Sequence, residues 1–298
     1  MSFSPVYVVT SYKNPAQTVR LLRRLRDDSP RARLIVSHDR KTVPPSAASI
    51  SAVGAELWMT PEPIEWGDAS YLRSQLAILE VLQMDDATWL TFLTGQDYPI
   101  RPIAHFERHL ETCRADALLE MPDEDPGLDV HLERYLKRSY RMPRSFDRHS
   151  IRRIVGKMPG LELSHEPRGQ PPYLHRRRWR TPFNEQFPLR KGCDLFALSG
   201  RAARTLLDAP PSLLRYYAHT RIPSESYIHT VLRNDPTLTT RNEMLHHARW
   251  VASPHPEWLG SEDLDAILSS RRWFARKFRE DDRVLDLLDR VLDFEDPL

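Results

Sequence analysis

Two cations lie between two large aromatic residues near the end of the chain, in the segment Phe274-Ala275-Arg276-Lys277-Phe278. Lysine is rare in this protein, with six lysines among its 43 basic residues. A compact ammonium group on an apolar frame suits a phosphate oxygen, which is a point-like negative charge. An amphipathic segment with buried phenylalanines and solvated cations would show the same spacing. The first interpretation predicts a phosphate site at Arg276 and Lys277.

Glu225 is the candidate general base. It follows Ile222-Pro223-Ser224 and begins an apolar helix that runs to residue 232. A carboxylate placed beside a hydroxyl can take its proton during nucleophilic attack. A structural interpretation is also consistent, because Ser224 would cap this helix and Glu225 would favour its dipole. The sequence alone does not separate the two.

Polar residues follow several apolar runs at the points where the runs end. They are His38-Asp39, Gln96-Asp97 and Glu120. In parallel sheets, ligands bind outside the carboxyl ends of the strands, so these side chains are candidates for a ligand site. Polar loop residues after strands are ordinary, and each one alone is weak evidence.

Motifs for the common cofactors are absent. The chain has no GxGxxG or GxxxxGK[ST] loop, no GxSxG elbow and no HExxH or Cys/His ligand spacing. We therefore expect no cofactor and disfavour a phosphotransferase. Asp123-Glu124-Asp125 has the letters of a metal-binding pair but lies in a proline-bounded loop, so we expect no metal site.

The elements that must position these residues alternate along the chain. Strands are predicted at 6–10, 34–36, 89–93, 117–120 and 194–198, and helices at 15–25, 71–82, 106–113, 202–207, 225–232, 263–268 and 282–292. This alternation predicts an α/β fold, with a mostly parallel sheet flanked by helices in a single domain. Residues 122–190 are rich in Arg and Pro and are predicted to be a largely irregular insertion.

Composition limits the partners. The net charge of +2 gives no signal for nucleic acid, and two cysteines are too few for a disulfide framework. No apolar run approaches the length of a membrane span, and no signal peptide is evident, so we expect a cytoplasmic protein. The basic run 175–180 is interpreted as a solvated surface, with an anionic ligand or peripheral membrane contact as the alternative. The preference for Arg over Lys suggests a bacterial genome.

Seven segments, in this order, resemble the core-2/I-branching β-1,6-N-acetylglucosaminyltransferases and the related peptide O-xylosyltransferases. The segments are Val8-Val9-Thr10, Val36-Ser37-His38-Asp39, Trp66-Gly67-Asp68-Ala69-Ser70, Gly95-Gln96-Asp97-Tyr98-Pro99-Ile100, Pro223-Ser224-Glu225, His255-Pro256 and Phe274-Ala275-Arg276-Lys277-Phe278. The resemblance runs from about residue 6 to about residue 290. It implies a GT-A-type fold, a nucleotide-sugar donor, inversion at the anomeric carbon and catalysis without a metal ion.

The resemblance also implies roles for individual residues. Glu225 would deprotonate the acceptor hydroxyl, and Lys277 would hold the donor diphosphate with Arg276 nearby. Expected donor contacts also include His255, His38, Asp39 and Asp97, and expected acceptor contacts are Glu120, Arg134 and Trp250. Residues 1–121 would form the nucleotide-binding half and residues 191–298 the acceptor and catalytic half.

The chain departs from the family at two places. Relatives usually have His in the first loop, where this chain has Ser11-Tyr12. The branching enzymes also have a second phosphate-binding Arg, which His255 or Arg249 would have to replace. The resemblance implies transfer of N-acetylglucosamine or xylose from a donor, UDP-linked by family, to a carbohydrate or other hydroxyl acceptor. The alternative is a non-catalytic carbohydrate- or nucleotide-binding α/β protein.

Overall fold

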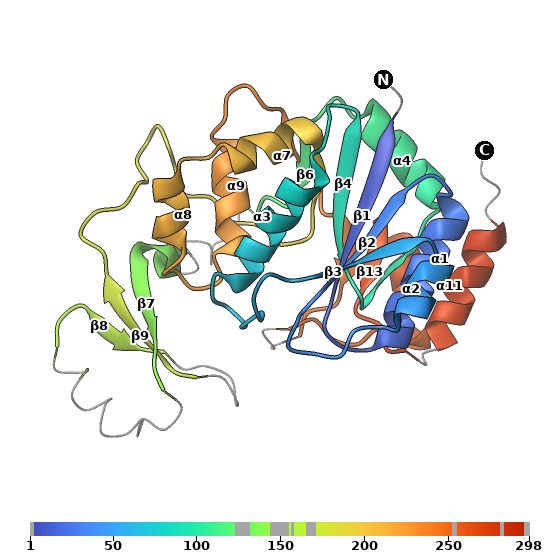
Figure 1. Cartoon of the computed structure of the whole chain (residues 1–298), viewed down its shortest axis with the longest axis horizontal. Coiled ribbons are helices and arrows are strands. Elements are labelled where there is room, and N and C mark those ends of the chain that lie inside the picture. Colours follow the sequence, from blue (N-terminus) through green and yellow to red (C-terminus); the bar gives the residue numbers. More distant parts are fainter. Residues whose placement is uncertain are drawn as a thin grey trace.

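A mixed seven-stranded sheet forms the centre of the molecule, in the order β11-β6-β10-β4-β1-β2-β3 (Figure 1). The computed structural model describes residues 3–122, 132–143, 155, 158–164, 171–251, 255–280 and 283–294. The strands are β1 (Ser4–Ser11), β2 (Arg33–His38), β3 (Ala55–Met59), β4 (Thr88–Thr94), β6 (Ala117–Leu119), β10 (Ala197–Ser199) and β11 (Thr240–Asn242). All neighbours are parallel except those of β10, which is antiparallel to β4 and β6. The predicted mainly parallel α/β sheet is confirmed.

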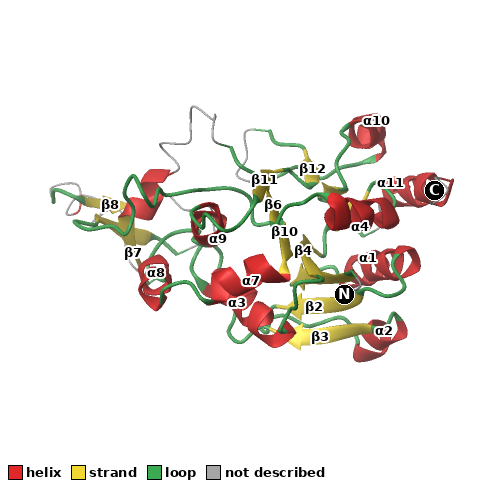
Figure 2. Cartoon of the chain, turned by 90° about the horizontal axis from the view of Figure 1, so that it is seen from above, coloured by secondary structure: helices red, strands yellow, loops and turns green. Residues whose placement is uncertain are grey.

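Helices cover both faces of this sheet. Successive residues of a strand point to opposite sides, and apolar residues on both sides need cover. Tyr7 and Val9 of β1 pack into a core with α1 (Pro15–Asp28), α2 (Ala47–Ala52), α4 (Ile103–Thr112), α10 (Leu264–Ser269) and α11 (Arg283–Phe294). Val6 and Val8 pack into a second core with α3 (Ser70–Leu82), α7 (Gly200–Leu207), α8 (Pro211–Tyr217) and α9 (Ser224–Arg233). Figure 2 shows these two groups of helices on either side of the strands.

A small second sheet supports the cation segment. It has the order β12-β13-β5, from β12 (His246–Ala248), β13 (Phe274–Arg276) and β5 (Asp97–Pro99). Phe274 and Phe278 are completely buried, as the spacing predicted. Arg276 and Lys277 are only partly exposed, so they are not simply solvated.

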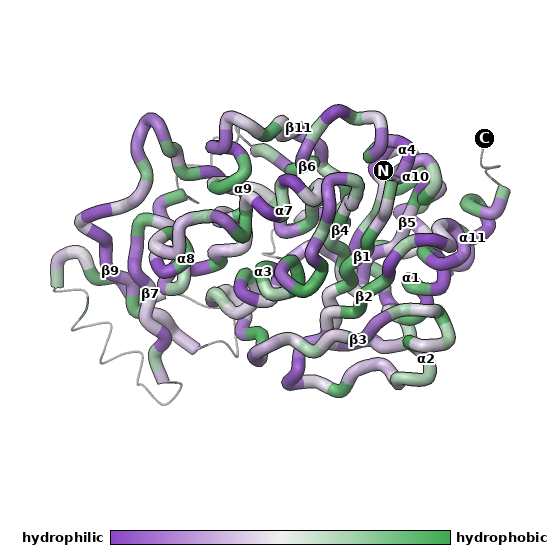
Figure 3. Tube along the Cα trace, turned by 45° about the horizontal axis from the view of Figure 1, so that its top comes forward, coloured by the Kyte–Doolittle hydropathy of each residue, from purple (hydrophilic) through white to green (hydrophobic). Residues whose placement is uncertain are grey.

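The insertion contains a third sheet, so the prediction of an irregular segment is wrong for part of it. Strands β7 (Lys137–Arg141), β9 (Tyr173–Arg177) and β8 (Leu161–Leu163) are antiparallel in the order β7-β9-β8, after a short 3-10 helix, η1 (Arg134–Leu136). This sheet lies at the far end of the molecule, beyond α8 (Figure 1). The trace around β9 is strongly hydrophilic (Figure 3), which explains why no apolar alternation marked the strand.

The basic run behaves largely as a surface. Arg176 and Arg177 are exposed and Trp179 is 93% exposed. Arg178 is different, because its guanidinium lies 3.7 Å from the centre of the Tyr216 ring and donates to the Tyr216 carbonyl at 2.9 Å. Across the described ranges, no helix combines the length and apolar character needed to cross a membrane.

Candidate functional site

The site lies at the edge where the parallel strands have their carboxyl ends. Thr10 of β1 pairs with Ser37 of β2 and Thr94 of β4, so the loops that follow these strands begin side by side. Strand β10 runs in the opposite direction, and its amino-terminal end therefore reaches the same edge. Asp194, which precedes β10, comes to the site for this reason.

A group of basic side chains surrounds the indole of Trp258. The ammonium of Lys277 lies 4.6 Å from the ring centre. Burial, with the positive charges of Lys13 and Arg276, lowers the pKa of Lys277 below its usual value. His255 lies in the same electrostatic neighbourhood, because burial, Lys277, Lys13 and Arg276 all lower its pKa. The structure thus brings Lys277, Arg276 and His255 together.

Asp97 connects this group to the body of the protein. It is directly opposite Arg276 in the second sheet, with 3.5 Å between Asp97 Oδ1 and Arg276 Nε. His246 Nε2 lies 3.2 Å from the other oxygen, and the backbone N–H and hydroxyl of Thr94 donate to the carboxylate. Burial opposes ionisation, yet Arg276, His246 and Thr94 hold the pKa of Asp97 below its usual value. Asp97 is 0% exposed, so its position suits holding Arg276 rather than touching a ligand.

Glu225 lies in the first turn of α9, where its carboxylate is 29% exposed and 3.3 Å from Lys191 Nζ. The helix begins at Ser224 and its N-cap is Pro223, which makes no side-chain capping bond. In the structural alternative, the capping role of Ser224 is therefore wrong, while Glu225 does lie in the first turn of the helix. Lys191 holds the Glu225 carboxylate, and the Gly192 N–H holds the Glu225 backbone by donating to its carbonyl oxygen at 2.8 Å.

Gly192 is required for this arrangement. A Cβ at this position would meet His229 Cε1 at 2.0 Å and the carbonyl oxygen of Glu120 at 2.2 Å. Contacts this short are impossible for a side chain, and one of them is with backbone. The absence of a side chain lets the Lys191 segment pass between α9 and the end of β6.

Asp194 lies beside Glu225 in a strained electrostatic position. Burial and the nearby Glu225 raise the pKa of Asp194 to about 7, against the influence of Ser224, Lys191 and Arg276. One carboxylate oxygen of Asp194 is completely buried and has no hydrogen-bond partner among the residues that the structure describes. Arg276 thus acts on the pKa values of both Asp194 and Lys277, so it links the Glu225 group electrostatically to the Trp258 group.

The three expected acceptor residues lie in different surroundings. Burial raises the pKa of Glu120, while Cys193, Lys191 and Arg272 oppose this and Glu225 adds to it. Glu120 therefore belongs to the Glu225 group. Arg134 lies in η1. Burial and Glu225 raise the pKa of the buried Tyr135, and Arg134 lowers it, so both charges lie near this ring. Trp250 is 61% exposed after β12, so it is not a core residue.

His38 and Asp39 end β2 but are engaged with the protein. His38 is 1% exposed, and its ring nitrogens lie 2.7 Å from the hydroxyl of Ser11 and 2.9 Å from that of Thr42. Asp39 accepts from the backbone N–H groups of Lys41 and Ile64. Both residues are placed to shape the loops after β1 and β2.

Arg249 is not available as a replacement phosphate ligand. It donates to Asp263 at 2.5 Å and to the Trp258 carbonyl at 3.1 Å, so it fixes the loop that carries Trp258. Gln96 is buried, with 7% of its surface exposed, yet its side-chain nitrogen has no hydrogen-bond partner within the described ranges. The Gln96 carbonyl accepts from the N–H of Phe278, so this unused donor lies beside the Lys277 segment.

The turn before α9 carries backbone strain. Ile222 has a φ of 49°, a left-handed conformation that costs a β-branched residue about 1–2 kcal/mol. Its N–H donates to the carbonyl of Gly67 at 2.8 Å, which ties the turn to the Trp66-Gly67 loop. Gly67 has a φ of +74°, and a Cβ there would lie 2.4 Å from the Arg221 guanidinium. Gly67 therefore allows a tight turn of the backbone and the close approach of the Arg221 guanidinium.

In the part of the chain that the structure describes, no three His, Cys, Asp or Glu side chains are placed to hold a metal ion together. Asp123-Glu124-Asp125 lies outside the described residues.

Four residues of the site were not identified from the sequence: Lys13, Lys191, Asp194 and Trp258. The rarity of lysine was a usable signal, since Lys13 and Lys191 are two of the six. Asp194 gave no signal, because its position depends on the reversed direction of β10.

Comparisons with known proteins agree with this architecture. The sequence model of the Core-2/I-Branching enzyme family matches residues 6–268. Beta-glucuronosyltransferase GlcAT14B of Arabidopsis thaliana is 42% identical over 89 residues, which are 28% of this chain and 20% of that protein. GlcAT14A of the same plant is 40% identical over 87 residues, with the same coverage.

The matched segment is thus about a fifth of the length of these curated relatives. Among solved structures, mannose-6-phosphate isomerase from Helicobacter pylori matches with a TM-score of 0.31 and 12% identity, over 70% of this chain and 77% of that one. A similarity this low carries no weight for fold or function. The family match covers most of the chain, and the protein belongs to the Core-2/I-Branching enzyme family.

Proposed function

We propose that this protein is an inverting glycosyltransferase that works without a metal ion. The observation that supports the proposal is the Glu225 carboxylate, partly exposed beside Lys191 and linked through Asp194 and Arg276 to the electrostatic environment of Lys277. Family membership supports the same conclusion, as do the relatives that are named beta-glucuronosyltransferases.

In the proposed reaction, Glu225 takes the proton of an acceptor hydroxyl, and the freed oxygen attacks the anomeric carbon. The new glycosidic bond forms as the bond from that carbon to the phosphate oxygen breaks. The leaving nucleoside diphosphate keeps the electron pair, and Lys277 stabilises its developing charge with Arg276 behind it. Preorganised cations of this kind can supply the charge stabilisation that a divalent ion supplies in other enzymes. A single displacement inverts the anomeric configuration.

The donor is proposed to be a UDP-sugar. N-acetylglucosamine and xylose follow from the family resemblance, and glucuronic acid follows from the names of the plant relatives. The proposed acceptor is a hydroxyl of a carbohydrate, positioned by Glu120, Arg134 and Trp250. Asp39, His38 and Asp97 are proposed to shape the donor side without taking part in the bond changes.

The test is a turnover assay of the purified protein with UDP-linked N-acetylglucosamine, xylose and glucuronic acid, each with and without EDTA. We expect release of UDP from at least one donor, unchanged by EDTA and raised by an acceptor saccharide. Loss of activity in EDTA that Mn²⁺ restores would disprove the metal-free mechanism. Saturable UDP-sugar binding without turnover across the panel would instead indicate a non-catalytic binding protein.

A further inference from the structure

Two lysines from opposite ends of the chain meet at the Trp258 ring. Lys13 lies in the loop between β1 and α1, and Lys277 follows β13. Their ammonium groups are 5.6 Å and 4.6 Å from the centre of the same indole. The ring attracts each cation through its π-face, which holds both side chains near one place.

No carboxylate of a described residue forms an ion pair with either ammonium group. Every other described lysine has one, since Lys41 lies near Asp39, Lys137 near Glu162 and Lys191 near Glu225. Lys13 instead repels Lys277. After burial, Lys13 and then Arg276 lower the pKa of Lys277, while the carboxylate of Glu257, which forms no ion pair with Lys277, opposes them. Two unpaired like charges held together are unfavourable unless an anion binds between them.

We infer that Lys13 is a second cation of the diphosphate site, beside Lys277. The inference rests on the proposed function, since it assigns a ligand to the same donor site. A diphosphate carries negative charge on two neighbouring groups, and two separate ammonium groups match this better than one. Lys277 and Lys13 each contribute a compact charge that can meet one phosphate.

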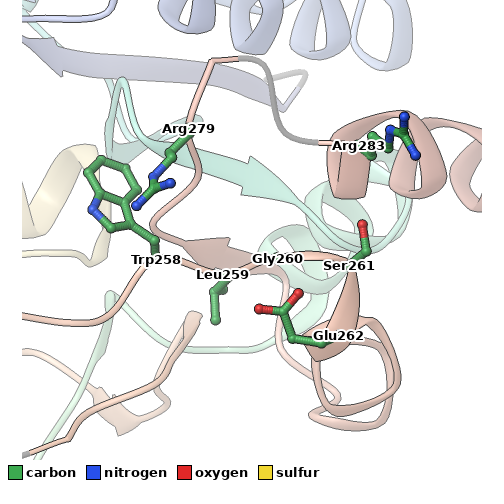
Figure 4. Close-up of a pocket in the computed structure, with 7 residues that line it drawn as sticks. All are labelled: Trp258, Leu259, Gly260, Ser261, Glu262, Arg279 and Arg283. Carbon is green, nitrogen blue, oxygen red and sulfur yellow. The ribbon is translucent and has the colours of Figure 1, made fainter.

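Neighbouring arginines are less suited to this role. Arg249 is engaged by Asp263. Arg279 also lies on the Trp258 ring, at 5.4 Å, but it lines an open pocket of about 430 Å³ with Arg283 and Glu262 (Figure 4). That pocket also contains the carboxylate of Glu262, whereas Lys13 lies on the Trp258 ring that Lys277 also contacts.

The test uses isothermal titration calorimetry with inorganic pyrophosphate, UDP and uridine on the full chain. Pyrophosphate reports the phosphate site whatever base the donor carries, and uridine reports contacts that involve no phosphate. Lys13→Met is expected to weaken pyrophosphate and UDP binding about tenfold, equivalent to about 1.4 kcal/mol, and to change uridine binding less than twofold. Lys13→Arg should recover most of the pyrophosphate affinity.

The control for the loss of one positive charge is Arg23→Met, an exposed residue of α1 for which no ion pair is found among the described residues. It should leave pyrophosphate and UDP affinity within twofold of wild type. Equal affinities in Lys13→Met and Arg23→Met, with a loss in Lys277→Met, would overturn the role of Lys13 and leave the donor site standing. Failure of the wild-type protein to bind UDP, GDP, dTDP or pyrophosphate would overturn both proposals. Unchanged melting temperatures would show that the variants are folded.

Discussion

Glu225 lies at the start of α9 with its carboxylate partly open to solvent and Lys191 3.3 Å away. The pairing fixes the direction of a side chain that has several rotatable bonds. A base must be held within hydrogen-bond reach of the proton that it removes, so this restraint matters for catalysis. Asp194 and Glu120 surround the same carboxylate, and their pKa values are raised through burial and their neighbours.

Replacement of Glu225 tests the base directly. Glu225→Gln keeps the size of the side chain and removes its basicity, so we expect kcat to fall about 10²–10⁴-fold while UDP binding stays within twofold. Steady-state kinetics and calorimetry measure the two quantities. Glu111→Gln, at an exposed position of α4, is the matched control and should turn over at the wild-type rate. A Glu225→Gln enzyme as fast as wild type would contradict the assignment.

Asp194 predicts a pH dependence of stability. Its pKa is about 7 in the folded protein, against 3.8 for an ordinary aspartate, so the folded state holds a proton that the unfolded state has lost between these values. The free energy of unfolding should therefore fall as the pH rises from about 4 to about 7 and show no further change from this group above that.

The measurement is the melting temperature of wild type and Asp194→Asn between pH 4 and 8. The variant should lose part of the decline, and its advantage over wild type should grow with pH up to about 7. Asp265→Asn, at an exposed position of α10, should follow the wild-type curve. Parallel curves for Asp194→Asn and wild type would show that Asp194 has an ordinary pKa.

At the scale of elements, strong local patterns gave reliable predictions. Helices α1, α3 and α9 lie within a few residues of their predicted bounds, because each has apolar residues at helical spacing. Strands β1, β2 and β4 were found as buried β-branched or apolar runs. Edge strand β3 was missed because its apolar run is short, Glu56 interrupts it and two of its five residues are exposed.

Gly192 offers a test at this scale. Gly192→Ala would place a methyl group 2.2 Å from the Glu120 carbonyl oxygen, so the backbone beside Lys191 must move. We expect a loss of about 1–3 kcal/mol in the free energy of unfolding and a larger loss of activity than stability explains. Urea denaturation and kcat measure these effects.

Gly160→Ala separates steric clash from backbone preference. Gly160 has a φ of +77°, and no atom of a described residue lies within 4 Å of an added Cβ. This variant should lose some stability but keep its kcat. A Gly192→Ala enzyme with normal kcat would mean that the close contact does not position Glu225.

At the scale of the molecule, Arg221 joins the insertion to the body. Its guanidinium lies 3.9 Å from the centre of the Tyr173 ring in β9 and 5.1 Å from that of Trp66, and it donates to the Trp66 carbonyl. Arg221 and Tyr173 are both buried. The rings of Trp66 and His255 lie edge to face, with 6.1 Å between their centres. The contacts of Arg221 therefore extend to His255, one of the basic side chains near Trp258.

Removal of this joint should loosen the insertion. Arg221→Met is expected to cost about 2 kcal/mol, because a buried cation–π contact and hydrogen bonding are lost. Hydrogen exchange should accelerate in β7 and β9 while β1 and β4 stay protected. Arg176→Met, at an exposed position of β9, is the control and should leave hydrogen exchange unchanged. Equal protection of β9 in Arg221→Met and wild type would contradict the role of the joint.

The sequence by itself determined the alternation of strands and helices, the burial of Phe274 and Phe278 and the resemblance to a family, because these depend on local spacing and short motifs. The tertiary structure decided which charges meet. Lys13 reaches Lys277 across more than 260 residues, and Asp194 reaches Glu225 because β10 runs against its neighbours. Such contacts depend on strand order and direction, and residue spacing along the chain does not encode them.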